Sequence, residues 1–323
     1  MTWNPDELEK VPCDSCGGRE ARQSFVRADG MLVVECAVCG LAYLSPRPLA
    51  DFISRFYEAD YFTGVRADEG VGGLRCNVSA GPTEVSEEAK SIPRVVEIIN
   101  EKFGGFQKKS ILEIGCATGD LLALLKSQGA SVKGLEISEF AADVARQRGL
   151  DVSTGRIEEY VKSTSQRFDI VIGMEVIEHV TSPLRFLDHV SELLREGGLL
   201  VLSTPNYLCT KRYREEWFGF QTSFEHLYYF SLPVLSRLAR DAGLSVAYSE
   251  SSRFLGDCRN NSSNRLARRY QRLKKLLEIV NEIGLLGTMG EIGNMRRGFL
   301  ASAIGHQLVV VFQWGGQARR HIS

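Results

Sequence analysis

Four cysteines near the start of the chain have the spacing of a metal site. They form two Cys-x2-Cys pairs with 19 residues between them: Cys13 with Cys16, and Cys36 with Cys39. Between the pairs, two short β-prone segments flank Asp29-Gly30, a turn signal typical of a hairpin. Buried or reactive thiols are the alternative, but the spacing and the hairpin together favour a tetrahedral zinc ion bound by four thiolates. Because four protein ligands leave no open position, we expect this Zn²⁺ to be structural.

A second group of residues has the pattern of a nucleotide-binding turn. Residues 112–119 run from a buried strand through Gly115 and Gly119 into a helix. In a dinucleotide fold such a turn cradles a pyrophosphate, but Glu113 inside the strand suits a cationic ligand better than a phosphate. The next strand ends at Glu136, where a carboxylate can accept both hydroxyls of a ribose. The turn and Glu136 together predict a nucleoside-bearing cofactor.

Alternating strands and helices must position these groups. The hydrophobic pattern predicts strands over residues 109–115, 132–136, 152–154, 168–172, 198–203, 245–249 and 307–312. It predicts helices over residues 84–103, 120–128, 139–148, 183–194 and 233–242. This alternation indicates an α/β fold with a mostly parallel, doubly wound sheet, which binds ligands at the carboxyl ends of its strands.

The composition is that of a globular protein of about two domains. Of the 323 residues, 44% are apolar and 24% charged, which is ample for a sizeable core. Lys and Arg number 39 against 40 Asp and Glu, so no basic field marks the chain as a nucleic-acid binder. No apolar run approaches the ~18 residues of a membrane span, and the acidic N-terminus lacks the apolar stretch of a secretory signal. We therefore expect a cytoplasmic protein.

Residues 112–119, 168–180 and 193–206, with Glu136 between them, resemble the class I S-adenosylmethionine (SAM)-dependent methyltransferases. The resemblance runs from about residue 85 to 250 and points to the small-molecule branch that includes ubiquinone-type O-methyltransferases. It implies a Rossmann-like, seven-stranded α/β sheet and SAM as the cofactor. The family's middle glycine is Ala117 in this sequence.

The resemblance implies cofactor roles for eleven positions. The residues that would wrap the methionine part of SAM are Glu113, Gly115, Ala117 and Gly119. Glu136 would hold the ribose, and Ile137 would flank the adenine. The residues that would cap the amino edge of the adenine are Arg156, Ile157 and Glu158. Met174 and Glu175 would close over the sulfonium side.

The N-terminal half shows a narrower resemblance. The cysteine pairs, residues 36–48 and residues 56–62 are similar to zinc-ribbon-bearing methyltransferases, which include sugar C-methyltransferases and enzymes encoded with polysaccharide genes. Residues 225–231 match the active-site region of that group, where a Glu-His pair serves deprotonation. Ser223-Phe224 departs from the pattern, which has a tyrosine there.

Two histidines that each follow a glutamate are the candidate general bases for methyl transfer. A methyltransferase mainly aligns the acceptor and removes its proton, and histidine suits this role because its pKa lies near neutral pH. We expect His226 to be the base, with Glu225 orienting its ring. We expect His179 to shape the cofactor site, with the base role as its alternative.

These observations predict three segments: a zinc ribbon over residues 1–47, an aromatic helix and linker over 48–83, and a methyltransferase domain over 84–323. A basic, amphipathic helical insertion is expected over about 256–303. The favoured function is methyl transfer to a small molecule, in particular C- or O-methylation of a sugar or glycan intermediate. One alternative is O-methylation of a quinone or lipid-like acceptor, with the insertion on a membrane surface as a less favoured variant. Another is a zinc-ribbon nucleic-acid-binding module, against which the neutral net charge argues.

Overall fold

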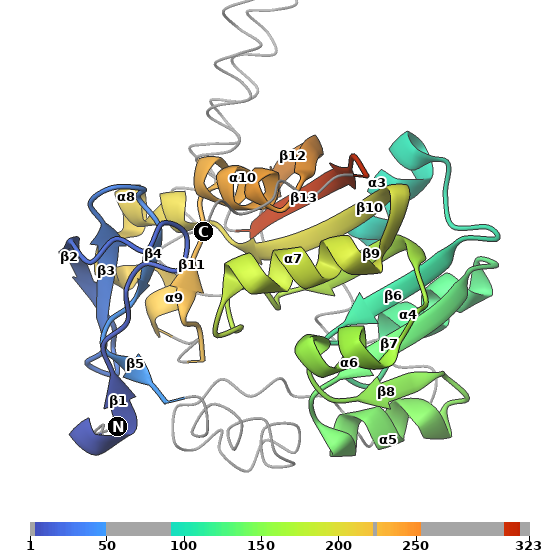
Figure 1. Cartoon of the computed structure of the whole chain (residues 1–323), viewed down its shortest axis with the longest axis horizontal. Helices are drawn as coiled ribbons and strands as arrows, with labels where there is room; N and C mark the ends of the chain where they lie inside the picture. The colour runs from blue at the N-terminus through green and yellow to red at the C-terminus, as the bar shows by residue number, and fades with distance from the viewer. Residues whose placement is uncertain (1–3, 50–91, 222–224, 253–306, 317–323) are drawn as a thin grey trace, which may run out of the picture.

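The computed structural model describes residues 4–49, 92–221, 225–252 and 307–316 (Figure 1). Within these residues, seven strands form one large sheet in the order β12-β13-β10-β9-β6-β7-β8. Its strands are β6 (Ser110–Ile114), β7 (Ser131–Glu136), β8 (Val152–Thr154), β9 (Phe168–Met174), β10 (Leu194–Pro205), β12 (Leu244–Ser252) and β13 (Gln307–Trp314). β13 runs antiparallel to β10 and β12, whereas β8, β7, β6, β9 and β10 pair in parallel. The predicted doubly wound α/β fold is confirmed.

Helices cover both faces of the large sheet (Figure 1). They are α3 (Ile92–Phe103), α4 (Asp120–Ser127), α5 (Glu139–Gln147), α6 (Ile157–Ser163), α7 (Pro183–Leu193) and α10 (Leu232–Asp241). Because strand side chains alternate, Ile170 and Ile172 of β9 pack with α3 and α4, whereas Val171 packs with α6, α7 and α10. Both faces are therefore apolar, which explains the nearly unbroken run of apolar residues in β9.

The predicted elements recur with small shifts at their ends. β10 begins at Leu194 instead of residue 198, with a register irregularity before Leu199. The helix α6 was not predicted, because its seven residues are too few for a clear helical period. The predicted helix over 84–103 is described only from Ile92. The predicted insertion over 256–303 lies outside the described residues, as does nearly all of the aromatic helix and linker.

The N-terminal module is a small sheet that the rest of the chain completes. Its strands are β2 (Ala21–Val26), β3 (Leu32–Cys36), β4 (Ala42–Leu44) and β11 (Tyr228–Tyr229), in the order β11-β4-β3-β2 among the described residues. The predicted hairpin is confirmed as β2–β3. In sequence β11 lies between β10 and β12 of the large sheet, yet Tyr228 pairs with Tyr43 and Tyr229 with Ala42. β1 (Leu8–Glu9) pairs with β5 (Arg47–Pro48), a pairing that the sequence analysis missed.

Remaining elements connect the two sheets. The short helices α8 (Thr210–Tyr213) and α9 (Phe218–Gln221) lie between β10 and β11, with the 3-10 turns η4 (Tyr207–Cys209) and η5 (Arg214–Glu216); η1 (Pro5–Glu7) lies near the N-terminus. One buried apolar cluster includes Val33 of the small sheet, Phe220 of α9 and Leu200 of the large sheet. The small sheet and one face of the large sheet thus share a core. None of the helices that the structure describes is both long and apolar enough to span a bilayer.

The first cysteine pair also caps a helix of the large sheet. Asp14, between Cys13 and Cys16, accepts hydrogen bonds from the Leu184 backbone N–H (2.9 Å) and the Ser182 hydroxyl (2.7 Å) at the start of α7. A carboxylate at this position satisfies backbone N–H groups that the helix itself cannot use, and it interacts favourably with the helix dipole.

We expect Asp14→Ala to lower the free energy of unfolding by about 1–2 kcal/mol, the usual cost of losing a helix cap. Denaturant unfolding of the full-length protein measures this loss. Asp14→Asn keeps one of the two acceptor oxygens and should lose less. Equal stability of the alanine variant and the unchanged protein would contradict the capping role.

Candidate functional site

The predicted glycine turn lies where β6 ends and α4 begins. Gly115 and Gly119 have φ angles of 71° and 85°, in the left-handed region that favours glycine. A Cβ on Gly115 would lie 2.7 Å from Val176 Cγ2, so the turn closely approaches the loop after β9. Ala117 also has a positive φ, 44°, which costs a non-glycine residue about 1–2 kcal/mol. The family's glycine preference at this place therefore has a backbone reason that Ala117 does not remove.

The carboxylate of Glu136 connects this turn to the end of β7. Its two oxygens accept hydrogen bonds from the backbone N–H groups of Ala117 and Ser138, both at 2.9 Å. Glu136 is buried, and burial raises its pKa although these hydrogen bonds oppose the shift. The Glu136 carboxylate, which is predicted to bind the ribose, is thus held in place by two hydrogen bonds at the carboxyl edge of the large sheet, beside the glycine turn.

Glu113 is a buried carboxylate of this edge with an unsatisfied oxygen. Its side chain is buried, and its Oε2 has no hydrogen-bond partner among the described residues. Burial and the neighbouring charge of Glu136 raise its pKa well above the usual range. A cationic group between the strands would compensate both carboxylates, which is the chemistry expected beside a sulfonium or an ammonium ion.

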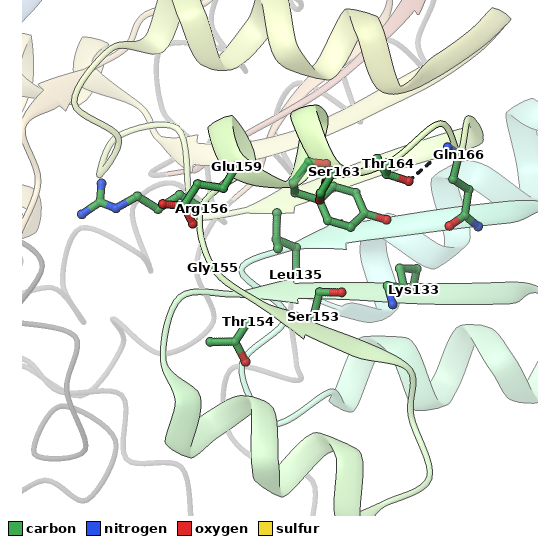
Figure 2. Close-up of a pocket in the computed structure, with 11 residues that line it drawn as sticks. Lys133, Leu135, Ser153, Thr154, Gly155, Arg156, Glu159, Ser163, Thr164 and Gln166 are labelled. Atoms are coloured by element: carbon green, nitrogen blue, oxygen red, sulfur yellow. Dashed lines mark hydrogen bonds between the residues drawn. The ribbon is translucent and has the colours of Figure 1, made fainter.

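The predicted adenine-side residues occupy different environments. Ile137 is 37% exposed, unusual for an isoleucine that directly follows a strand, and it offers an apolar surface to a ligand. Ile157 is buried in the core, so only its backbone could reach a ligand. Glu158 and Arg156 are half-buried at the start of α6. In Figure 2 the Arg156 side chain extends away from the other labelled side chains.

A cavity of about 410 Å³ lies between α6 and the strands β7 and β8 (Figure 2). Lys133 and Leu135 of β7 line it, together with Glu159 and Tyr160 of α6. Because side chains alternate along a strand, Lys133 and Leu135 project from the face of β7 opposite to Glu136. This cavity is therefore distinct from the predicted ribose position.

The predicted sulfonium-side residues lie where β9 ends: Met174 is its last residue, and Glu175 begins the loop after it. Glu175 has a φ of 51°, a strained conformation for a non-glycine residue. Its Oε1 accepts hydrogen bonds from the Ser203 hydroxyl (2.7 Å) and the Gln307 side-chain amide (2.8 Å). β10 and β13 thus hold this carboxylate in place. Met174 is half-buried against the core.

The structure brings the two predicted histidines together. The ring centroids of His179 and His226 lie 4.7 Å apart, edge to face. Glu178 lies beside both, with its Oε1 at 4.0 Å from the Nε2 atom of each ring. The backbone N–H groups of Leu227 and Tyr228 both donate to the Glu178 carbonyl, which joins the two loops. We name Glu178, His179 and His226 the histidine cluster.

The histidine cluster is buried and has unmet hydrogen-bonding capacity. Neither Glu178 oxygen nor His226 Nδ1 has a hydrogen-bond partner among the described residues. Burial lowers the pKa of His179 to about 4. Burial, His179 and Arg27 lower the pKa of His226. Burial and the Glu175 carboxylate raise the pKa of Glu178 well above its usual range. The three ligand atoms lie within 4.8 Å of one another, close enough for one cation to contact all of them, but the 4.0 Å separations between Glu178 and the two rings are too long for hydrogen bonds.

Glu225 forms no ion pair with the His226 ring among the described residues, contrary to the expectation that it orients the ring. Its Oε2 has no hydrogen-bond partner among the described residues, and burial raises its pKa to about 7. Glu178 is the carboxylate beside the imidazole instead. The sequence analysis did not select Glu178, although its place directly before His179 was a usable signal. What decides between the two glutamates is the meeting of two loops, which local sequence does not reveal.

The four N-terminal cysteines converge as their spacing predicts. The sulfur atoms of Cys13 and Cys39 lie 3.4 Å apart, and those of Cys16 and Cys36 lie 3.6 Å apart. All four sulfurs lie within 4.8 Å of one another, and the thiols are free of disulfides. A tetrahedral ion with Zn–S bonds of about 2.3 Å needs sulfurs roughly 3.8 Å apart. The cluster therefore has the donor set and the size of a four-thiolate zinc site.

Comparisons with known proteins agree with this fold. A family model described as "Methyltransferase domain" matches residues 88–249, half of the chain. A ubiquinone biosynthesis O-methyltransferase from Actinobacillus pleuropneumoniae serotype 7 is 31% identical over 124 residues, which cover 35% of this chain and 53% of that protein. Another from Cereibacter sphaeroides is 40% identical over 106 residues, which cover 31% of this chain and 43% of that protein. The chain spans about half the length of the curated relatives it matches.

A solved structure shares the architecture. Magnesium protoporphyrin IX methyltransferase from Synechocystis PCC 6803, solved with bound SAH, superposes with a TM-score of 0.50 at 15% sequence identity. The superposition covers 82% of this chain and 99% of that chain. At this identity the likeness concerns the fold alone. The family model matches half of the chain, and the large sheet with the glycine turn at its carboxyl edge has the matching architecture. This chain therefore belongs to the class I SAM-dependent methyltransferases.

Proposed function

We propose that the protein transfers the methyl group of SAM to a hydroxyl oxygen of a quinone-like or phenolic small molecule. The observation that carries the proposal is the buried histidine cluster at the carboxyl edge of the large sheet. The names of the relatives, ubiquinone biosynthesis O-methyltransferases, support an aromatic hydroxyl as the acceptor. They support it better than the sugar acceptor that the sequence favoured, which depends on the ribbon and on the Glu225-His226 motif.

The residues at the carboxyl edge fit SAM as the cofactor. Glu113 Oε2 is buried and unpartnered among the described residues, and the nearby Glu136 adds a second negative charge. A ligand that carries a sulfonium and an ammonium group supplies the missing positive charge. Glu136 would hold the ribose hydroxyls, and the exposed Ile137 would contact the adenine. When bound, SAM supplies a methyl group that is already activated for displacement.

The protein's own contribution is to align the acceptor and to take its proton. The neutral His226 ring would accept the proton of the acceptor hydroxyl as that oxygen forms its bond to the methyl carbon and the carbon–sulfur bond breaks. The products are a methyl ether, S-adenosylhomocysteine and a protonated imidazole. The positive charge on the ring would favour the ionised form of Glu178, whose Oε1 lies 4.0 Å from the His226 Nε2 atom, and the ionised carboxylate would stabilise the imidazolium. His179, whose Nε2 atom lies 4.0 Å from the same Glu178 oxygen, would be the alternative base.

The N-terminal cysteines would hold one structural zinc ion. The donor set of four thiolates is complete within the module, and the two knuckle turns place the sulfurs around one centre. A zinc ion there would supply much of the folding energy of a module too small to be stabilised by its own core.

The purified protein is expected to contain one zinc per chain. Cys36→Ser should remove the metal, because a three-thiolate site binds zinc far more weakly. Elemental analysis of the full-length protein measures this. Cys209→Ser is the matched control, since Cys209 is a buried cysteine of the large domain outside the cluster, and it should retain the metal. Unchanged zinc content in the Cys36→Ser protein would contradict the assignment.

Glu136→Ala should weaken SAM and S-adenosylhomocysteine equally, because the ribose hydroxyls do not change in the reaction. The expected loss is about 1.5–3 kcal/mol for hydrogen bonds to a charged group. Calorimetry measures both affinities. Glu136→Gln should lose less, and Glu159→Ala, at the cavity beside α6, should bind both ligands as the unchanged protein does. A normal affinity of Glu136→Ala would exclude the ribose role.

His226→Asn should lower methyl transfer by ~10²–10⁴-fold with less than a twofold change in SAM affinity, because a positioned base acts on the acceptor alone. The assay uses SAM with a labelled methyl group and two probe acceptors, 3,4-dihydroxybenzoate and a nucleotide-linked deoxysugar. His189→Asn in α7 is the control and should be unaffected.

The same assay separates the alternatives. We expect Glu178→Gln to lower turnover more than Glu225→Gln, because Glu178 is the carboxylate beside the ring. We expect the labelled methyl group on the phenolic probe. Methylation of the sugar probe alone would overturn the aromatic acceptor, and full turnover of His226→Asn with loss in His179→Asn would assign the base to His179.

A further inference from the structure

An arginine of the N-terminal module reaches the backbone of the candidate base. Arg27 directly follows β2, and its side chain is completely buried, with 0% exposure. Its Nη1 donates hydrogen bonds to the His226 carbonyl oxygen at 3.0 Å and to the Tyr229 hydroxyl at 3.2 Å. One guanidinium thus contacts both ends of the segment 226–229, which carries the base and β11.

The hairpin turn of the module fixes the position of this guanidinium. Arg27 Nε donates to Asp29 Oδ1 at 3.1 Å, and the Asp29 side chain is only 1% exposed. Asp29 also accepts from the Met31 backbone N–H, and Gly30 N–H donates to the Arg27 carbonyl to close the turn. Buried charges are tolerated only when they are paired and hydrogen-bonded, so the pair has a single geometry. Because the guanidinium is planar and rigid, fixing it at Asp29 also fixes the directions of its hydrogen bonds to the His226 carbonyl and the Tyr229 hydroxyl.

Strand pairing holds the residues that follow the histidine. Tyr228 and Tyr229 pair with β4, and Leu44 N–H donates to the Leu227 carbonyl at 2.9 Å. From the other side, the Glu178 carbonyl accepts the N–H groups of Leu227 and Tyr228. The His226 backbone is therefore held between the small sheet and the loop that bears the other members of the histidine cluster.

A second arginine of the module makes a parallel contact to that loop. Arg47 Nη1 donates to the Thr181 carbonyl at 2.8 Å, two residues after His179, and to the Tyr228 hydroxyl at 3.0 Å. The N-terminal module thus contacts both histidine-bearing loops through buried or half-buried arginines. Hydrogen bonds from its arginines to the His226 and Thr181 carbonyls are not expected of a module that only binds a separate partner.

We propose that Arg27 is a positioning residue for methyl transfer: through its hydrogen bonds to the His226 carbonyl and the Tyr229 hydroxyl, the N-terminal module sets the position of the base. This inference rests on the proposed role of His226. It makes the ribbon a part of the active site instead of a separate nucleic-acid-binding or docking module.

The test compares full-length, metal-loaded variants. Arg27→Met alone leaves Asp29 buried without its partner, so the main variant is Arg27→Met with Asp29→Asn, which removes both charges. Arg27→Lys keeps the charge and one hydrogen bond. Arg94→Met is the matched control, because Arg94 makes the same kind of bond to Glu250, at 2.7 Å, between α3 and β12.

Hydrogen–deuterium exchange with S-adenosylhomocysteine present is the first measurement. We expect exchange of residues 226–230 to accelerate at least tenfold in the double variant and less in Arg27→Lys, with residues 110–136 unchanged. Arg94→Met should leave residues 226–230 unchanged. Equal acceleration of residues 226–230 and 110–136 would mean that Arg27 stabilises the whole protein and does not position the base, which would overturn the inference. Unchanged exchange of residues 226–230 would also overturn it.

Turnover with the probe acceptor is the second measurement. The double variant should lose at least tenfold in kcat while its affinity for S-adenosylhomocysteine stays within twofold, and Arg27→Lys should recover part of the loss. A normal kcat in the double variant would overturn the positioning role. Should His226→Asn keep full turnover, the proposed base fails, while the exchange measurement still decides whether Arg27 holds the segment.

Discussion

The pairing of β11 with β4 is the interaction on which the acceptor side of this protein depends. A two-residue strand from the second half of the chain, Tyr228–Tyr229, closes a sheet whose other strands lie within the first 44 residues. Because of this pairing, His226 lies next to the loop after β9, which bears Glu178 and His179 at the carboxyl edge of the large sheet. The two histidine-bearing loops also contact each other directly, because the Glu178 carbonyl accepts hydrogen bonds from the Leu227 and Tyr228 N–H groups. A shared apolar core packs the two sheets together at this junction.

Buried carboxylates occur on both sides of the site. Glu113, Glu136 and Glu178 all lie at or next to strand ends, and burial raises the pKa of each. Glu136 is compensated by two backbone N–H groups, whereas Glu113 and Glu178 keep oxygens without partners among the described residues. Such groups cost stability unless a ligand meets them. Their concentration at one edge of the sheet is the physical reason to expect a positively charged cofactor there and a proton in transit beside it.

Two of the four non-glycine residues with positive φ among the described residues lie in the same region. Ala117 and Glu175 are both non-glycine residues with positive φ, one in the turn after β6 and the other in the loop after β9. Each is held by hydrogen bonds from a neighbouring strand end: Ala117 N–H to Glu136, and the Glu175 carboxylate to Ser203 and Gln307. Strained residues persist only where their surroundings over-determine them. These hydrogen bonds hold the backbone of the proposed cofactor edge in place, which would favour the precise alignment that methyl transfer requires.

Sequence by itself determined the elements and their local chemistry. The alternation of apolar strands with helices predicted the parallel sheet, the cysteine spacing predicted four converging sulfurs, and the position of Glu136 after its strand predicted a carboxylate beside the glycine turn. These features are encoded in short stretches with a clear period or spacing, so they can be read without a partner segment. Only the tertiary structure decided that Glu178 and not Glu225 lies beside the His226 ring, and that Arg27 holds the His226 carbonyl. Those contacts depend on β11 and on one buried guanidinium. A two-residue strand and a single side chain produce no periodic pattern in the sequence, and their contacts form only when distant segments pack together.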